Sequence, residues 1–277
     1  NRAELPSQLF FDARATHPAN LRCVSPGFVE WLMGFPRGWT AAAALDREAL
    51  STHPVSQLQA ELHASGWRPR KVLSLFSGCG GLDYATSPWF QVLAYCEIDP
   101  DARNVLGARM SDGSLARAPI LPDARLVQPS DVPDGIEGIV LGSPCTDFST
   151  AKGRKRKGID GEESKLVMEL FRVCDLIDSV SFVFFENVDG LCALPCSWET
   201  LLGEFVRRGF VLQWVTMEAT AVGSPQRRRR LFLLGRRGRS LQELPAMLPG
   251  EASLSVASPR WHCTPSQCGR PSNPPGR

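Results

Sequence analysis

The sequence has little net charge, no long apolar run and no signal for secretion. Its 31 Lys and Arg residues are balanced by 29 Asp and Glu residues, which leaves a formal net charge of +2. No apolar run is long enough to cross a membrane, and no secretory signal opens the chain. We therefore expect no membrane partner and an intracellular location, the nucleus in a eukaryote or the cytoplasm in a bacterium or phage.

Regular metal-binding motifs are also absent. The nine cysteines form no pair of C-x-x-C motifs, so the sequence predicts no metal site. Several cysteines lie in or beside apolar segments of a long chain, which indicates a reducing compartment rather than a disulfide framework. The chain begins at Asn1 rather than at Met, which predicts a fragment or a processed product.

Short apolar runs alternate with helical stretches from Lys71 onward. This alternation favours an α/β fold with a mostly parallel sheet and helices on both faces. Such sheets bind ligands beyond the carboxyl ends of their strands. We expect an N-terminal segment (1–66), a core (67–238) and a low-order tail rich in Pro, Ser, Gly and Arg (239–277). Strands are predicted at 72–76, 92–96, 136–141, 182–185, 211–217 and 231–234, and helices at 101–110, 164–177 and 198–206.

A glycine-rich turn, residues 78–81, follows the first predicted strand. Glycines there let the backbone approach a ligand with no side chain in the way, although the third glycine of the dinucleotide fingerprint is missing. Glu97 follows the next strand about twenty positions on, where a carboxylate can bond a ribose diol, and Asp131 suits an adenine edge. The combination predicts an adenosine-type cofactor. For Glu97 and Asp99 the alternative is capping of the next helix, and both can hold at once.

Cys145 follows the predicted strand at 136–141. A small buried hydrophobe is the default for a cysteine. Here, however, Pro144 fixes the turn, and the polar residues that follow favour a new helix start. A thiol near a helix start or near an arginine has a lowered pKa and becomes a nucleophile.

Glu186 comes directly after a strand of four apolar residues. Partial desolvation at that place suits a proton donor, and the alternative is a helix cap, for which the neighbouring Asn187 is suitable.

Basic residues are clustered at 152–157 and 227–230. Local basic strips on a near-neutral protein can hold a polyanion, and a solvated charged face is the alternative. If the second cluster is extended, Gln226, Arg228 and Arg230 share one face. An arginine aimed into a polar pocket can hold a carbonyl oxygen or a phosphate.

Taken in chain order, these motifs resemble those of the C5-cytosine methyltransferase family. Residues 76–82 resemble the first motif, 97–99 the second, and Pro144-Cys145 with Phe148-Ser149 the catalytic motif. Glu186-Asn187-Val188 and Gln226-x-Arg228-x-Arg230 resemble the next two, and about forty residues separate cysteine from glutamate and glutamate from glutamine.

The resemblance implies a Rossmann-like, S-adenosylmethionine-dependent core that methylates C5 of cytosine in duplex DNA, with the target base flipped out of the stack. The Cys145 thiolate would attack C6, Glu186 would support protonation at N3, Arg230 would hold O2, and Arg228 would help position the site. The implied cofactor-binding residues are Phe76, Ser77, Gly78, Gly80, Gly81, Leu82, Glu97, Ile98, Asp131 and Val132. The implied substrate-binding residues are Pro144, Ser149, Asn187, Gln226, Lys152 and Arg154.

The chain departs from the family pattern at both ends. The target-recognition region expected after the arginine motif, and the Gly-Asn motif beyond it, have no counterpart. Residues 25–40 instead resemble a segment found near the C-terminus of some bacterial and phage members, which predicts a permuted or truncated member. The alternative for this segment is an amphipathic helix that packs on the sheet through Phe28, Trp31 and Leu32. Two further functions stay open: a non-catalytic or partner-dependent remnant that binds cofactor or nucleic acid, and C5-cytosine methylation of RNA.

Overall fold

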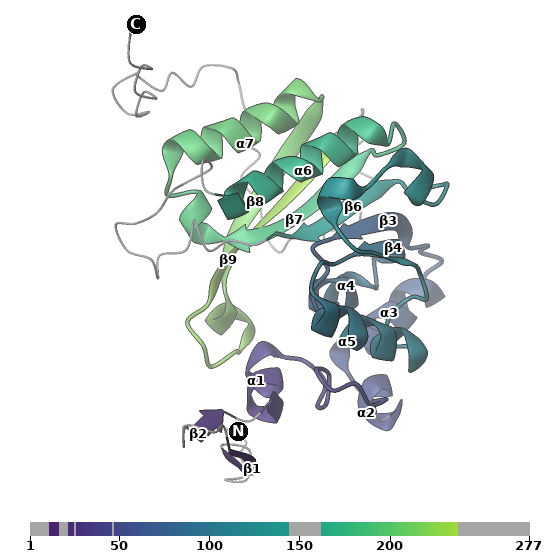
Figure 1. The fold of residues 1–277 in the computed structure, drawn as a ribbon, viewed down its shortest axis with the longest axis vertical. Coiled ribbons are helices and arrows are strands. Elements are labelled where there is room, and N and C mark those ends of the chain that lie inside the picture. The colour runs from purple at the N-terminus through teal and green to yellow at the C-terminus, as the bar shows by residue number, and fades with distance from the viewer. Residues whose placement is uncertain (1–10, 17–21, 25, 46, 144–161, 238–277) are drawn as a thin grey trace, which may run out of the picture. The chain divides into compact units, whose positions relative to one another are not determined.

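A computed structural model describes residues 11–16, 22–24, 26–45, 47–143 and 162–237 (Figure 1). Their contacts divide the chain into two compact units. The first contains residues up to Leu141 together with Glu218–Arg228, and the second contains Gly142–Met217 and the residues from Arg229 onward. Outside the described residues lie the predicted tail (239–277) and five predicted site residues: Pro144, Cys145, Ser149, Lys152 and Arg154.

Four parallel strands form the sheet of the first unit, in the order β5-β4-β3-β6. Side chains of β3 and β6 such as Leu73, Leu75 and Ile139 are fully buried, as expected for parallel strands covered on both faces. Because the strands are parallel, their carboxyl ends meet at one edge of the sheet. The strands are β3 (Arg70–Leu75), β4 (Phe90–Cys96), β5 (Ile120–Leu121) and β6 (Gly138–Gly142).

Two helices follow the carboxyl ends of β3 and β4: α4 (Gly81–Thr86) and α5 (Pro100–Ser111). The carboxylate of Asp99 starts α5 by accepting hydrogen bonds from the backbone N–H groups of Asp101 and Ala102, at 2.8 and 3.0 Å. Such a cap satisfies amides that lack a partner within the helix. The chain therefore turns sharply at the edge of the sheet and returns along its face.

The residues before β3 belong to the same unit and are more structured than the sequence predicts. β1 and β2 pair in antiparallel fashion, and three helices follow, of which only the first was expected. The side chains of Phe28 and Trp31, predicted to pack on the sheet, lie outside the described part of the chain. The elements are β1 (Phe11–Thr16), β2 (Arg22–Val24), α1 (Pro26–Met33), α2 (Arg47–Ser51) and α3 (Pro54–Ala64).

The second unit contains three strands in the order β7-β9-β8, and its helices α6 and α7 cover them (Figure 1). The two helices meet through an edge-to-face contact of Phe171 with Phe205, whose ring centroids are 4.9 Å apart. Phe205 also packs on β9, where a Cβ on Gly235 would lie 3.4 Å from its ring. The elements are α6 (Glu162–Leu176), β7 (Phe182–Val188), α7 (Pro195–Arg207), β8 (Phe210–Glu218) and β9 (Arg229–Arg237).

β7 and β9 run antiparallel, with Val188 opposite Arg230 and Phe182 opposite Arg236. The first residues of β9 therefore lie beside the carboxyl end of β7. Short 3-10 helices occupy several connections, namely η2 (Ala124–Leu126), η3 (Pro129–Asp131), η6 (Asp189–Leu191) and η7 (Ala219–Val222).

The predicted α/β fold is confirmed, and the predicted strands and helices of the core agree with the structure to within a few residues. One local expectation is wrong. β7 continues to Val188, so Glu186 lies inside the strand, opposite Phe232 of β9, rather than after it. β9 begins at Arg229, after a turn formed by η7 and Gly223 (φ +86°), so Gln226 and Arg228 do not meet the condition of an extended segment under which they were expected to share a face with Arg230. Within the described ranges, no helix has the length and apolarity needed to span a membrane.

Candidate active site

The glycine turn after β3 has an unusual backbone. Gly78 and Gly80 have φ angles of +55° and +78°, and Phe76 has φ +55°. A left-handed conformation at a phenylalanine costs roughly 1–3 kcal/mol and persists only where the surroundings fix it. Gly80 has a second requirement, because a Cβ there would lie 2.5 Å from Cδ1 of Leu115.

Ser77 ties this turn to the end of β4. Its backbone N–H donates to the carbonyl of Cys96 at 3.0 Å, and its hydroxyl accepts from the Cys96 N–H at 3.2 Å. The same hydroxyl lies 2.8 Å from that of Ser74. Ser77 is buried, so its structural role is to fix the turn at the carboxyl edge of the sheet.

Glu97, at the end of β4, reaches the glycine turn directly. Its carboxylate accepts hydrogen bonds from the N–H of Gly78 at 2.6 Å and from the N–H of Asp99 at 2.8 Å. The side chain is largely buried, and these bonds compensate the cost of burying a charge. A carboxylate has about four acceptor positions, so Glu97 can accept further hydrogen bonds from a ligand. Capping of α5 falls to Asp99 alone.

The remaining residues predicted to bind a cofactor lie in the same unit. Ile98 follows Glu97 and is 59% exposed, which leaves an apolar side chain free to cover a flat ring. Asp131 is exposed and accepts from the N–H of Gln128 at 2.9 Å, and Val132 ends η3. A Cβ added to Gly78 would have no neighbouring atom within 4 Å, so the space beside this residue is open. Open space at the turn, spare acceptors on Glu97 and an exposed apolar neighbour fit an adenosine-type group.

In the second unit, Glu186 and Arg230 form an ion pair. The distance from Arg230 Nε to Glu186 Oε1 is 3.0 Å, and both side chains are about three-quarters buried. The antiparallel register explains the contact, because the first residues of β9 lie beside the last residues of β7. The structure thus brings together an acid and a cation that are 44 residues apart in the sequence.

Asn187, next to Glu186, connects β7 to the segment that leads to Cys145. Its side-chain Nδ2 donates to the hydroxyl of Ser143 at 2.8 Å, and its Oδ1 accepts from the N–H of Val188 at 2.8 Å. Both Asn187 and Ser143 are buried. The chain two residues before Cys145 is therefore held beside the residue that follows Glu186.

Gln226 and Arg228 lie in the first unit and contact the end of α1. Gln226 Nε2 donates to the carbonyl of Leu32 at 2.7 Å, and Arg228 Nη1 lies 3.6 Å from the sulfur of Met33. Gln226 was predicted to bind substrate and Arg228 to help position the site, and those roles stay predictions.

Three buried residues around the glycine turn were not predicted: Trp39, Asp83 and Arg109. Trp39 Nε1 donates to the carbonyl of Cys79 at 2.9 Å, and Arg109 is fully buried beneath it. The resemblance of residues 25–40 to a family segment was a signal for Trp39. An arginine directly after apolar positions of a helix was a weaker signal for Arg109. Among the described residues, no group of three or more His, Cys, Asp or Glu side chains could hold a metal ion.

Comparison with known proteins gives a consistent result. The family model described as C-5 cytosine-specific DNA methylase matches residues 70–255. Type II methyltransferase M.CviJI of Paramecium bursaria Chlorella virus IL3A is 29% identical over 164 residues, which cover 59% of this chain and 42% of that protein. Type II methyltransferase M.NgoPII of Neisseria gonorrhoeae is 30% identical over 172 residues, which cover 61% of this chain and 48% of that protein. The matched region is thus less than half the length of either relative.

Among solved structures, the Entamoeba histolytica methyltransferase EhMeth aligns with a TM-score of 0.50 at 15% sequence identity. The alignment covers 65% of this chain and 56% of that one. At this level of identity the similarity shows the fold.

Proposed function

Because the chain belongs to the C-5 cytosine-specific DNA methylase family, we propose that it transfers a methyl group to C5 of cytosine in DNA. Members of this family use S-adenosylmethionine as the methyl donor. When bound, this donor supplies an electrophilic methyl group. The glycine turn would accommodate it without side-chain interference, and the spare acceptors of Glu97 would bond its ribose hydroxyls. The residues that would hold it are Phe76, Ser77, Gly78, Gly80, Gly81, Leu82, Glu97, Ile98, Asp131 and Val132.

C5 of cytosine is too weak a nucleophile to accept a methyl group unaided. In the proposed mechanism the Cys145 thiolate forms a bond to C6, and the electron pair of the C5–C6 double bond shifts to C5, in conjugation with C4 and N3. Glu186 supports a proton at N3, so that the ring accepts this charge, while Arg230 holds O2. C5 then takes the methyl group. Loss of the C5 proton to water, with departure of the sulfur carrying the S–C6 electron pair, would restore the aromatic ring and the Cys145 thiolate, and the methyl donor would be left as S-adenosylhomocysteine.

The observation that carries this proposal is the pairing at the end of β7. Glu186 lies 3.0 Å from Arg230, and Asn187 holds Ser143, two residues before Cys145, through a buried hydrogen bond. The Glu186-Asn187 motif, Arg230 of the arginine motif and Ser143, which precedes Cys145 by two residues, thus lie together in the second unit. A carboxyl and a guanidinium side by side match the N3 and O2 edge of a cytosine.

We also propose which residues contact the DNA backbone and what each segment of the chain does. The basic strip that contains Lys152 and Arg154 would contact DNA phosphates, and the target base would leave the duplex stack. Residues 67–238 would form the catalytic core, with residues 1–66 in the place of the family's C-terminal region. Pro144, Ser149, Asn187 and Gln226 would shape the substrate side of the site.

The test is transfer of a labelled methyl group from S-adenosylmethionine to duplex DNA, with tRNA as a parallel substrate. We expect label on DNA at C5 of cytosine, and loss of at least about a hundredfold in rate for Cys145→Ser. The matched control is Cys192→Ser, which changes a half-buried cysteine that we assign no role and should leave the rate unchanged.

Two results would overturn this proposal. Label on tRNA alone would assign the chemistry to RNA. Binding of cofactor or DNA with no transfer to either nucleic acid would make the chain a binding module or a subunit that depends on a partner.

A further inference from the structure

The segment between α1 and α2 packs directly on the glycine turn. Trp39 has no exposed surface, and its ring lies between Phe35 and Tyr84, with centroid distances of 5.6 and 4.7 Å. Its indole N–H donates to the carbonyl of Cys79 at 2.9 Å. Phe35 also packs against the turn: a Cβ added to Gly81 would lie only 2.5 Å from Cζ of Phe35.

The two residues that flank Trp39 in the sequence are both hydrogen-bonded to Glu30. The buried carboxylate of Glu30 accepts from the N–H groups of Gly38 and Thr40, each at 2.7 Å, and from the Thr40 hydroxyl at 2.6 Å. A buried carboxylate with three donors fixes the backbone around it. The indole therefore has little freedom to leave the Cys79 carbonyl.

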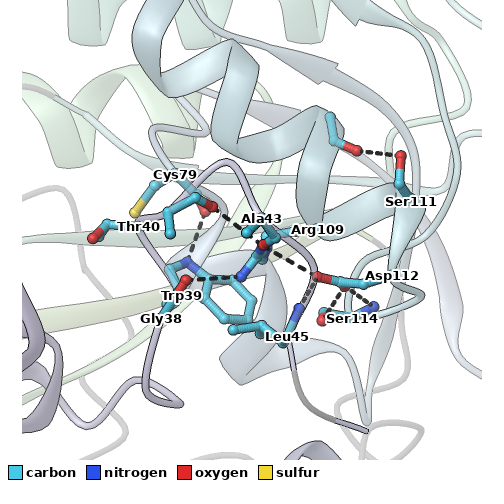
Figure 2. A network of polar contacts seen from close by, with 12 residues as sticks. Gly38, Trp39, Thr40, Ala43, Leu45, Cys79, Arg109, Ser111, Asp112 and Ser114 are labelled. Carbon is cyan, nitrogen blue, oxygen red and sulfur yellow. Dashed lines mark hydrogen bonds and ion pairs between the residues drawn. The ribbon is translucent and has the colours of Figure 1, made fainter.

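Arg109 of α5 contacts the same segment (Figure 2). Its guanidinium donates to the carbonyls of Gly38 and Ala41 at 3.2 Å each, and to that of Ala43. It also forms an ion pair with Asp112 at 3.2 Å. Figure 2 shows Arg109 beside Trp39. The guanidinium carbon of Arg109 lies 5.7 Å from the centre of the indole ring.

The contact with Trp39 controls one particular peptide group. The N–H of Gly80 donates to the carbonyl of Ser77 at 2.9 Å, while the Cys79 carbonyl of the same peptide accepts from Trp39. This peptide, which joins Cys79 to Gly80, is thus held at both ends within a run of glycines that tolerate many conformations. Without the indole donor, its carbonyl end loses this hydrogen bond.

We propose that residues 30–43 are a clamp that positions the cofactor-binding turn, with Trp39 acting on the turn and Arg109 acting through Trp39. Both are positioning residues rather than catalytic ones. This inference rests on the proposed function, since it assigns the turn to S-adenosylmethionine. The clamp sets the affinity for cofactor and leaves the chemical step alone.

The experiment is calorimetric titration of the full chain with S-adenosylhomocysteine. Trp39→Phe keeps an aromatic ring between Phe35 and Tyr84 but removes the N–H donor. One net hydrogen bond corresponds to roughly a two- to tenfold change in affinity, and we expect a loss in that range. In methyl transfer, KM for S-adenosylmethionine should rise by the same factor while kcat at saturation is unchanged.

The matched control is Trp214→Phe, the same substitution on β8 of the second unit, where Trp214 packs edge-on against Trp198. It should leave cofactor affinity unchanged even if it lowers the melting temperature. Arg109→Lys keeps the positive charge but loses the planar fork that bonds several carbonyls, and it should also weaken binding. Because both residues act on one peptide, the double variant should lose less affinity than the two single losses combined.

The outcomes separate this inference from the proposed function. Wild-type affinity in both Trp39→Phe and Arg109→Lys would overturn the clamp and leave the proposed function standing. A loss in kcat with unchanged KM would also overturn it. If Trp39→Phe does not fold, Arg109→Lys alone decides. Failure of the unmodified chain to bind S-adenosylhomocysteine would overturn both proposals.

Discussion

Asp83, buried on α4 behind the glycine turn, should make the protein less stable as the pH rises. Its side chain is 3% exposed, and the nearby Ser74 hydroxyl offsets only part of the cost of burying a charge there. Burial raises the pKa of Asp83 from 3.8 to about 7, because an apolar surrounding disfavours the charged form.

The sign of the effect follows from proton uptake. Between about pH 4 and 7 the folded protein keeps a proton on Asp83 that the unfolded chain has lost. The stabilisation that comes from the protonated carboxyl is therefore complete below about pH 4, decreases as the pH rises, and is lost once the pH has passed about 7. One pKa unit corresponds to about 1.4 kcal/mol. The shift from 3.8 to about 7 therefore gives a loss on the order of 4 kcal/mol at neutral pH and above.

Asp83→Asn removes the titration while keeping the shape of the side chain. We expect the variant to be more stable than wild type above pH 7, by about 1–4 kcal/mol, and the difference to shrink by about 1.4 kcal/mol per pH unit between pH 7 and 4. Urea denaturation at a series of pH values, followed by circular dichroism, measures it. Titrations elsewhere in the protein cancel in the comparison.

The matched control is Asp112→Asn, the same substitution at a carboxylate that is paired with buried Arg109. Here the loss of the ion pair should destabilise the protein at neutral pH, by about 3 kcal/mol. If wild type and Asp83→Asn show the same dependence on pH between 4 and 7, the argument from burial is refuted.

Two other substitutions test the site and the turn. Glu186→Gln removes the charge that faces Arg230 and should lower the single-turnover methyl-transfer rate by about a hundredfold or more, with cofactor binding retained; an unchanged rate would exclude Glu186 from the chemistry. Gly80→Ala, at φ +78° with Leu115 in the way, should lower the free energy of unfolding by about 1–3 kcal/mol. Gly203→Ala, in the open on α7, should raise it by up to about 1 kcal/mol, and equal effects at both glycines would contradict the reasoning.

Much of the core could be predicted because burial leaves a local pattern. The apolar runs of β3, β6 and β7 are strands covered on both faces, and each ends in polar residues at the edge where ligands bind. α3 has no such pattern, since none of its residues is buried. Its start depends instead on His53, which accepts from the N–H of Val55, and the sequence analysis did not use that signal.

The supporting residues of the site were harder to predict, because their partners are distant in the sequence. The bond from Trp39 to Cys79 spans 40 residues, and Arg109 bonds carbonyls 66 to 71 residues before it. An arginine in a helix is usually exposed, and only the fold shows that the backbone of residues 38–43 surrounds the guanidinium of Arg109. At 226–230 the sequence left the conformation open, and the turn at Gly223 is what separates Gln226 and Arg228 from the strand.

The bond between Gln226 and Leu32 has a consequence for how the protein is made. It joins residues 194 positions apart. Glu218–Arg228 belongs to the first unit but follows Gly142–Met217 of the second unit in the sequence. During synthesis, then, the amino-terminal half emerges from the ribosome long before its last contributing residues exist. The ribosome adds about 5–20 residues per second, so the 87 residues between Leu141 and Arg228 (228 − 141) take roughly 4–17 seconds, during which the amino-terminal half lacks the bond that joins Leu32 to Gln226.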